Sequence, residues 1–149
     1  RGGVEGGGEW TLRGVVAAEE AKMAGELGAD AITGASQGGL QLDGALSSIK
    51  VLPEIMDAVG GDIEVHLDSG IRSGQDVLKA LALGAKGTMI GRAFVYGLGA
   101  MGQAGVTHAL EGIHKELDTT MALCGEKSVE NLGRHNLLVP ADFTGTWAP

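Results

Sequence analysis

Two arginines that follow glycines at the ends of apolar runs are the residues with the clearest chemical meaning in this sequence. Asp68-Ser69-Gly70-Ile71-Arg72 comes directly after the apolar run Ile63–Leu67. Gly91-Arg92 comes directly after a second run, Gly87–Ile90. If both runs are parallel strands, their ends lie side by side at one edge of a sheet. Guanidinium groups beside exposed backbone N–H groups bind anions, so the pattern predicts an anion site, most plausibly for a phosphate.

A capped helix must lie between these two strands. Ser73-Gly74-Gln75-Asp76 has the Ser-x-x-acid pattern of a helix start, and Gly84 is a typical residue just beyond a helix end. The other expected elements, in chain order, are a strand at Trp10–Val16, a helix at Ala17–Leu27, a strand at Ala29–Thr33, a glycine-rich loop at Gly34–Gly44, a helix at Ser47–Val59, a loop or short helix at Tyr96–Gly102 and a long helix at Gln103–Leu123. Pro53 is expected to set a break or a new first turn within its helix.

Strand and helix patterns alternate in four tandem units, which predicts an α/β fold. The units are Trp10–Leu27, Ala29–Val59, Ile63–Leu83 and Gly87–Leu123. Such alternation predicts parallel strands with right-handed crossovers. Four strands could form a small open sheet or half of a (β/α)8 TIM barrel, which needs about 250 residues when complete. A phosphate site on the last two strands is typical of such barrels and favours the C-terminal half-barrel.

Composition restricts the classes of partner. The formal net charge of −8 argues against a nucleic-acid surface but leaves room for a small anion held by a local pair of arginines. Many of the 27 glycines lie at expected turns, and others form a head, residues 1–9, that we expect to be disordered. The single Cys124 excludes an internal disulfide and favours a reducing, cytoplasmic compartment. No apolar run approaches the roughly 18 residues of a membrane span, no signal peptide is visible, and no Cys/His spacing suggests a metal site.

Two long segments carry a family resemblance. Gly34–Asp43 and Asp68–Arg92 resemble the C-terminal half of the FMN-dependent α-hydroxy-acid dehydrogenases and oxidases, with the strongest likeness to bacterial flavin L-lactate dehydrogenases. The likeness rests on DSGIR, LALGA and GRAFVYGL, and extends over about Leu12 to Leu138. It implies a (β/α)8 barrel of which this chain holds strands five to eight, with residues 10–138 as the half-barrel and 139–149 as an irregular tail.

The resemblance implies an FMN site on the residues that match the family. Asp68 would hold ribityl hydroxyls, and Ser69, Gly70, Ile71 and Arg72 would lie along the phosphate side. Gly91 and Arg92 would clasp the phosphate, and Arg13 stands where the family has a lysine near the flavin N1. The plainer alternative is that Asp68 pairs with Arg72 at the strand end while Arg92 is solvated.

The residues of the chemical step depart from the family. The family motif Ser-Asn-His-Gly-Gly-Arg-Gln-Leu-Asp is here Ala-Ser-Gln-Gly-Gly-Leu-Gln-Leu-Asp, residues 35–43. Gln37 replaces the histidine that acts as general base, and an amide cannot accept a proton at neutral pH. Leu40 replaces the arginine that binds the substrate carboxylate. The loss of a general base removes about 10²–10⁴-fold of rate, so the chain is expected to be inactive or severely impaired.

Three functions are compatible with these observations. The first is FMN-dependent oxidation of a lactate-type L-2-hydroxy acid to the 2-oxo acid, with this chain as part of the enzyme. The second is a non-catalytic module that binds FMN or phosphate, and the third is a fragment without function. The expected partners are a small 2-hydroxy acid and either a missing N-terminal half-barrel or further copies of the chain. Some lactate dehydrogenases of this type associate with membranes, so the expected cytoplasmic location extends to the inner membrane face, although the sequence shows no anchor.

Overall fold

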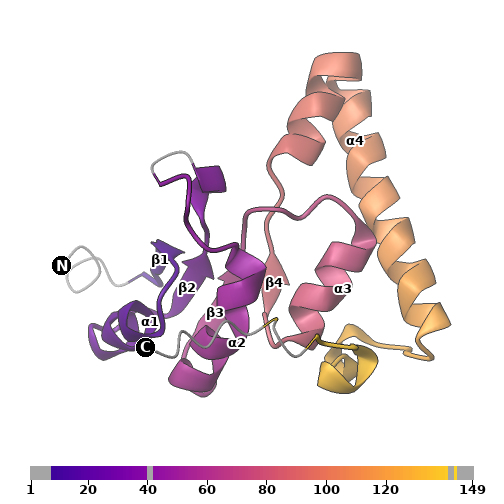
Figure 1. Ribbon diagram of the computed structural model, residues 1–149. Helices are drawn as coiled ribbons and strands as arrows, with labels where there is room; N and C mark the ends of the chain where they lie inside the picture. The colour runs from indigo at the N-terminus through magenta and orange to yellow at the C-terminus, as the bar shows by residue number, and fades with distance from the viewer. Residues whose placement is uncertain (1–7, 40–41, 141–142, 144–149) are drawn as a thin grey trace.

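A parallel four-stranded sheet forms the centre of the protein (Figure 1). The structure is a computed structural model that describes residues 8–39, 42–140 and 143 of the chain. The strands follow chain order across the sheet and are β1 (Thr11–Val15), β2 (Ala31–Gly34), β3 (Glu64–Leu67) and β4 (Gly87–Thr88). Every neighbouring pair is parallel, which confirms the predicted α/β fold. β4 is shorter than the expected run Gly87–Ile90.

Each strand is followed by a helix. The four are α1 (Ala18–Glu26), α2 (Ser48–Val59), α3 (Gly74–Ala82) and α4 (Arg92–Leu123), with short 3-10 turns η1 (Gln37–Gly39), η2 (Val129–Asn131) and η3 (Arg134–Asn136). The predicted cap of α3 is present. The Ser73 hydroxyl accepts from the Asp76 N–H at 3.2 Å, and Asp76 accepts from the Ser73 N–H at 3.0 Å. The cap therefore fixes where the chain leaves the strand-end turn before α3.

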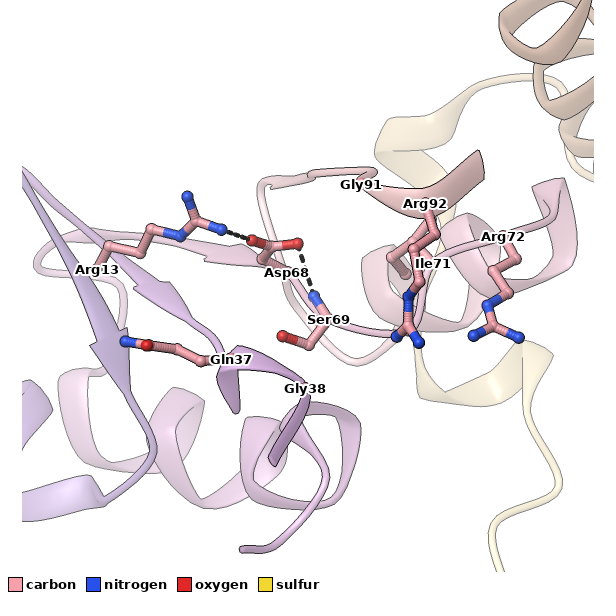
Figure 2. A pocket seen from close by; sticks show the side chains of 10 residues that line it. Arg13, Gln37, Gly38, Asp68, Ser69, Ile71, Arg72, Gly91 and Arg92 are labelled. Carbon is pink, nitrogen blue, oxygen red and sulfur yellow. Dashed lines mark hydrogen bonds and ion pairs between the residues drawn. The ribbon is translucent and has the colours of Figure 1, made fainter. Parts of the chain in front are cut away.

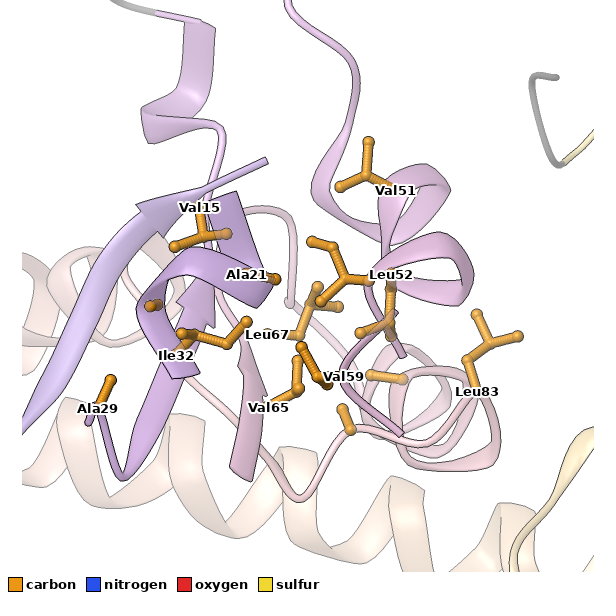
Figure 3. Close-up of a cluster of buried hydrophobic side chains, with 14 of the residues drawn as sticks. Val15, Ala21, Ala29, Ile32, Val51, Leu52, Val59, Val65, Leu67 and Leu83 are labelled. Carbon is orange, nitrogen blue, oxygen red and sulfur yellow. The ribbon is translucent and has the colours of Figure 1, made fainter. Parts of the chain in front are cut away.

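The hydrophobic core lies where one face of the sheet meets α1 and α2 (Figure 3). Ile32 and Val65 are paired in register on β2 and β3, so they project to the same face. Leu52 and Ile55 of α2 are fully buried in the same cluster. On the alternate positions, Arg13, Thr33, His66 and Gly87 are aligned across the four strands. The sheet thus has an apolar face that packs and a second face carrying polar side chains.

The expected break at Pro53 is wrong. α2 runs without interruption from Ser48 to Val59 and contains Pro53 in its interior. Proline lacks an N–H group, so one hydrogen bond of the helix is lost at this position. Pro53 is itself buried, beside Val51, Leu52 and Ile55. Burial of this apolar face offsets the missing bond, which is why tertiary packing prevails over local propensity.

α4 begins earlier than the sequence indicated and folds back on itself. The helix starts at Arg92, so most of the segment expected as a loop or short helix is helical. A non-helical step at Met101 and Gly102 separates two limbs, which Figure 1 shows as a hairpin. The limbs touch at two glycines, because a Cβ on Gly105 would lie 1.8 Å from the Gly97 carbonyl oxygen. Among the described residues, no helix is both long and apolar enough to cross a membrane.

The second limb of α4 packs on α3 through another glycine. A Cβ on Gly74 would lie 2.0 Å from the backbone nitrogen of Leu117. The Gly74 N–H donates to Glu116 Oε2 at 2.9 Å. On this limb, Met121 is buried and Leu110 is exposed. The close contact with α3 therefore lies on the C-terminal half of this limb.

Glu126, which follows the end of α4, forms hydrogen bonds to the segment that comes after it. These bonds predict that the stability of this segment depends on pH. Glu126 accepts from Asn136 Nδ2 at 2.9 Å and from His135 Nε2 at 3.1 Å. The bond from Asn136, then that from His135, lowers the pKa of Glu126 below its ordinary 4.5. A lowered folded-state pKa contributes stability above the ordinary value, and this contribution is lost as pH falls through the folded pKa. We expect protease cleavage near Leu138 to increase at pH below 4.5.

The matched variant for this prediction is Glu126→Gln. An amide keeps an acceptor oxygen but does not titrate, so cleavage should become independent of pH through the same range. Cleavage that rises equally in both proteins as pH falls would show that another group controls the segment. An acid-resistant protease such as pepsin provides the measurement.

Candidate functional site

A cavity of about 670 Å³ opens beyond the C-terminal ends of the strands. Its volume lies within the range of small-molecule sites. The lining residues are Arg13, Gln37, Gly38, Asp68, Ser69, Gly70, Ile71, Arg72, Gly91 and Arg92 (Figure 2). The cavity therefore gathers nine of the ten site residues that the sequence indicated. The tenth, Leu40, lies outside the described residues.

One end of the cavity carries positive charge and backbone N–H donors. The guanidinium groups of Arg72 and Arg92 point to the same side of the cavity in Figure 2. Arg92 is the first residue of α4, where the helix dipole disfavours a cation unless an anion lies nearby. Within the described part of the chain, the N–H groups of Gly70 and Gly91 have no hydrogen-bond acceptor. Two cations and two such N–H groups, one in the turn after β3 and one at the start of α4, form a donor set that suits a phosphate.

A strained turn connects β3 to this donor set. Ser69 has φ 75° and Gly70 has φ 105°, both in the left-handed region. A non-glycine residue in this region is uncommon and costs on the order of 1 kcal/mol or more. The Ser69 N–H donates to Asp68 Oδ1 at 2.7 Å, which offsets part of that cost. The turn brings Gly70 and Ile71 to the cavity wall.

Asp68 forms an ion pair with Arg13, which joins the end of β3 to β1. Asp68 is buried at 8% exposure, whereas the Arg13 side chain is 64% exposed. The alternative in which Asp68 pairs with Arg72 is therefore wrong. In the described part of the chain, neither Arg72 nor Arg92 has an acidic partner within 4.0 Å. Both guanidinium groups remain available to a ligand.

Gln37 lies at the opposite end of the cavity, on η1. Its backbone φ is 50°, and its side chain is exposed. Gln37 Nε2 lies 3.2 Å from the position that a Cβ on Gly14 would occupy, so the amide rests against β1. Gly38 also lines the cavity, although the sequence pattern indicated only that it belongs to the glycine-rich loop. An amide donates and accepts hydrogen bonds but takes up no proton at neutral pH.

His66 lies outside the cavity lining. Its Nε2 is 3.3 Å from Glu64 Oε2 on the same strand. The cavity thus offers an anion-binding end, a buried carboxylate paired with a cation, and an uncharged end at Gln37. This arrangement can hold an anionic ligand, but its described residues include no histidine to serve as a base.

Comparison with known proteins shows the family to which the chain belongs. Residues 5–139 match the family described as FMN-dependent dehydrogenase. The chain is 47% identical over 131 residues to an L-lactate dehydrogenase of Vibrio cholerae and 48% identical to one of Azorhizobium caulinodans. These matches take in 88% of this chain. Among solved structures, mandelate oxidase is 45% identical and aligns over 85% of this chain with a TM-score of 0.82.

The chain is shorter than these relatives. It spans 35% of the Vibrio cholerae protein, 34% of the Azorhizobium caulinodans protein and 37% of mandelate oxidase. The four parallel strands align with 37% of a TIM-barrel oxidase. They therefore form a partial barrel. The partial barrel has two strand edges, at β1 and β4, that no described strand covers.

Proposed function

Because the chain belongs to the family of FMN-dependent dehydrogenases, we propose that its cavity binds FMN and that the chain forms the cofactor-binding part of a 2-hydroxy-acid oxidoreductase. The observation that carries the proposal is the pair Arg72 and Arg92 beside free N–H groups in a cavity of about 670 Å³. This donor set fits a phosphate dianion, because charged donors and backbone N–H groups each favour its oxygens. The L-lactate dehydrogenase relatives support a lactate-type substrate.

The roles of the other lining residues follow from their chemistry. Asp68 keeps one oxygen near Arg13 and the other on the Ser69 N–H, so its remaining lone pairs can accept from ribityl hydroxyls. Arg13 of β1 places a cation at the cavity wall, where it would favour negative charge on the flavin ring. When bound, FMN supplies a ring that accepts a hydride from the carbon bearing the alcohol.

We propose that this chain turns over 2-hydroxy acids poorly or not at all. Gln37 stands where a general base would take the hydroxyl proton, and its amide cannot hold that proton. Leu40 offers no donor to a substrate carboxylate. No strand among the described residues covers β1 or β4 at the sheet edges, which supports a barrel that needs further strands. We propose that the remaining strands come from an N-terminal half-barrel.

A flavin titration of the purified chain tests this function. We expect saturable quenching of FMN fluorescence, with FMN bound at least about tenfold more tightly than riboflavin, which lacks the phosphate. Equal affinity for the two flavins would contradict the phosphate assignment, and the absence of any binding would contradict the function. Bleaching of bound flavin by L-lactate would show that Gln37 and Leu40 do not prevent turnover.

A further inference from the structure

A buried serine beneath the cavity holds the strained turn that forms its wall. Ser48 is the first residue of α2 and is 1% exposed. Its hydroxyl donates to the backbone carbonyl of Ser69 at 2.9 Å. Ser48 does not line the cavity, whereas Ser69 and Gly70 do. This bond therefore joins the start of α2 to the turn after β3, from the side away from the ligand.

The direction of this bond determines where the next N–H group points. All peptide bonds among the described residues are trans. In a trans peptide the C=O and the N–H of the unit point in opposite directions. Because the Ser69 carbonyl points at Ser48, the Gly70 N–H of the same peptide points away from Ser48. Gly70 lines the cavity, and its N–H has no acceptor in the described part of the chain.

The Ser69–Gly70 peptide has an alternative orientation that the bond excludes. The Ser69 N–H is already held by Asp68, and Gly70 is followed by the capped start of α3. Rotation of the peptide between these fixed points changes only ψ of Ser69 and φ of Gly70. Glycine adopts φ of either sign without steric cost, and a Cβ at Gly70 would meet nothing within 4 Å. The Ser48 hydroxyl is thus the contact that selects between the two orientations.

We infer that Ser48 is a positioning residue for phosphate: it turns the Gly70 N–H toward the anion-binding end of the cavity without touching the ligand. This inference rests on the proposed binding of FMN. Removal of the hydroxyl leaves the partly buried Ser69 carbonyl without this donor and frees the peptide to rotate. Rotation withdraws the N–H from the phosphate and presents a carbonyl oxygen, which repels an anion. The rest of a flavin, which makes no use of this N–H, is unaffected.

Titrations of Ser48→Ala with FMN and with riboflavin test the inference. We expect FMN affinity to fall about fivefold to fiftyfold, as for a weakened charge-assisted hydrogen bond, while riboflavin affinity stays within about twofold. Ser47→Ala is the matched control, because Ser47 is the adjacent exposed serine and its side chain makes no capping bond. It should leave both affinities unchanged. A loss shared equally by both flavins, or no loss, would overturn the inference.

A second measurement separates this inference from the proposed function. The amide resonance of Gly70 is followed by NMR during addition of inorganic phosphate to the original chain and to Ser48→Ala. A shift in the original chain that is lost in the variant supports the positioning role, even if FMN itself fails to bind. A Gly70 resonance that responds to phosphate in both proteins, or in neither, shows that Ser48 does not set this N–H.

Discussion

Replacing Arg92 with alanine is expected to weaken FMN binding by about 10- to 100-fold, the effect of removing one charge-assisted contact to a phosphate. Arg92 is the first residue of α4 and has no acidic partner within 4.0 Å among the described residues. Its guanidinium charge is therefore not neutralised before a ligand arrives. Riboflavin should bind the variant as it binds the original chain. Flavin fluorescence quenching measures both affinities.

Arg134→Ala is the matched control for this prediction. Arg134 also carries one exposed positive charge, but it pairs with Asp57 at 3.2 Å, on residues that do not line the cavity. The two variants change the net charge equally, so a comparison removes any general electrostatic effect on an anionic ligand. If both variants weaken FMN binding to the same extent, Arg92 has no specific contact with the phosphate.

The second large effect is a gain of activity from Gln37→His with Leu40→Arg. The test joins the chain to the part of the Vibrio cholerae L-lactate dehydrogenase that it does not span, because the chain alone covers 35% of that enzyme. A histidine at 37 supplies a proton acceptor at the end of the cavity opposite Arg92, and should raise kcat for L-lactate by about 10²–10⁴-fold. The arginine at 40 supplies a bidentate partner for the substrate carboxylate.

The single variants separate the two contributions. Leu40→Arg alone should lower KM while kcat stays low, since binding is restored without a base. Gln37→His alone should raise kcat at saturating L-lactate. Failure of the double variant to exceed the unmodified fusion would refute the role assigned to these two positions. Steady-state kinetics with an artificial electron acceptor provides the readout.

Much of the fold follows from local sequence signals. Alternating strand and helix patterns, glycines at helix ends and the Ser73–Asp76 cap predicted the four parallel units and the point at which α3 begins. The edge at which the cavity lies also followed, because parallel strands bring their C-terminal ends together. Nine of the ten indicated site residues line one cavity for this reason.

Three features depended on tertiary contacts and could not be predicted from local patterns. Asp68 pairs with Arg13, 55 residues away, because β1 and β3 flank β2 and bring the two side chains to one edge. Pro53 is tolerated because its helix buries an apolar face in the core. α4 extends back to Arg92 because its first limb packs on the second through Gly97 and Gly105. In each case a tertiary contact outweighs the local pattern.

Because β4 is short, we expect ligand binding to change how often this strand opens. β4 has only two residues in the ladder, Gly87 and Thr88, and it lies at the edge of the sheet three residues before Gly91. A ligand that binds only when β4 is paired with β3 stabilises this paired state by RT ln(1 + [L]/Kd). The stabilisation is about 2.7 kcal/mol at a ligand concentration of 100 times Kd. Amide exchange at Met89, whose N–H bonds to the Leu67 carbonyl at 2.8 Å, should slow about 100-fold in proportion. The exchange rate of this single amide would therefore report the fraction of the chain that has ligand bound.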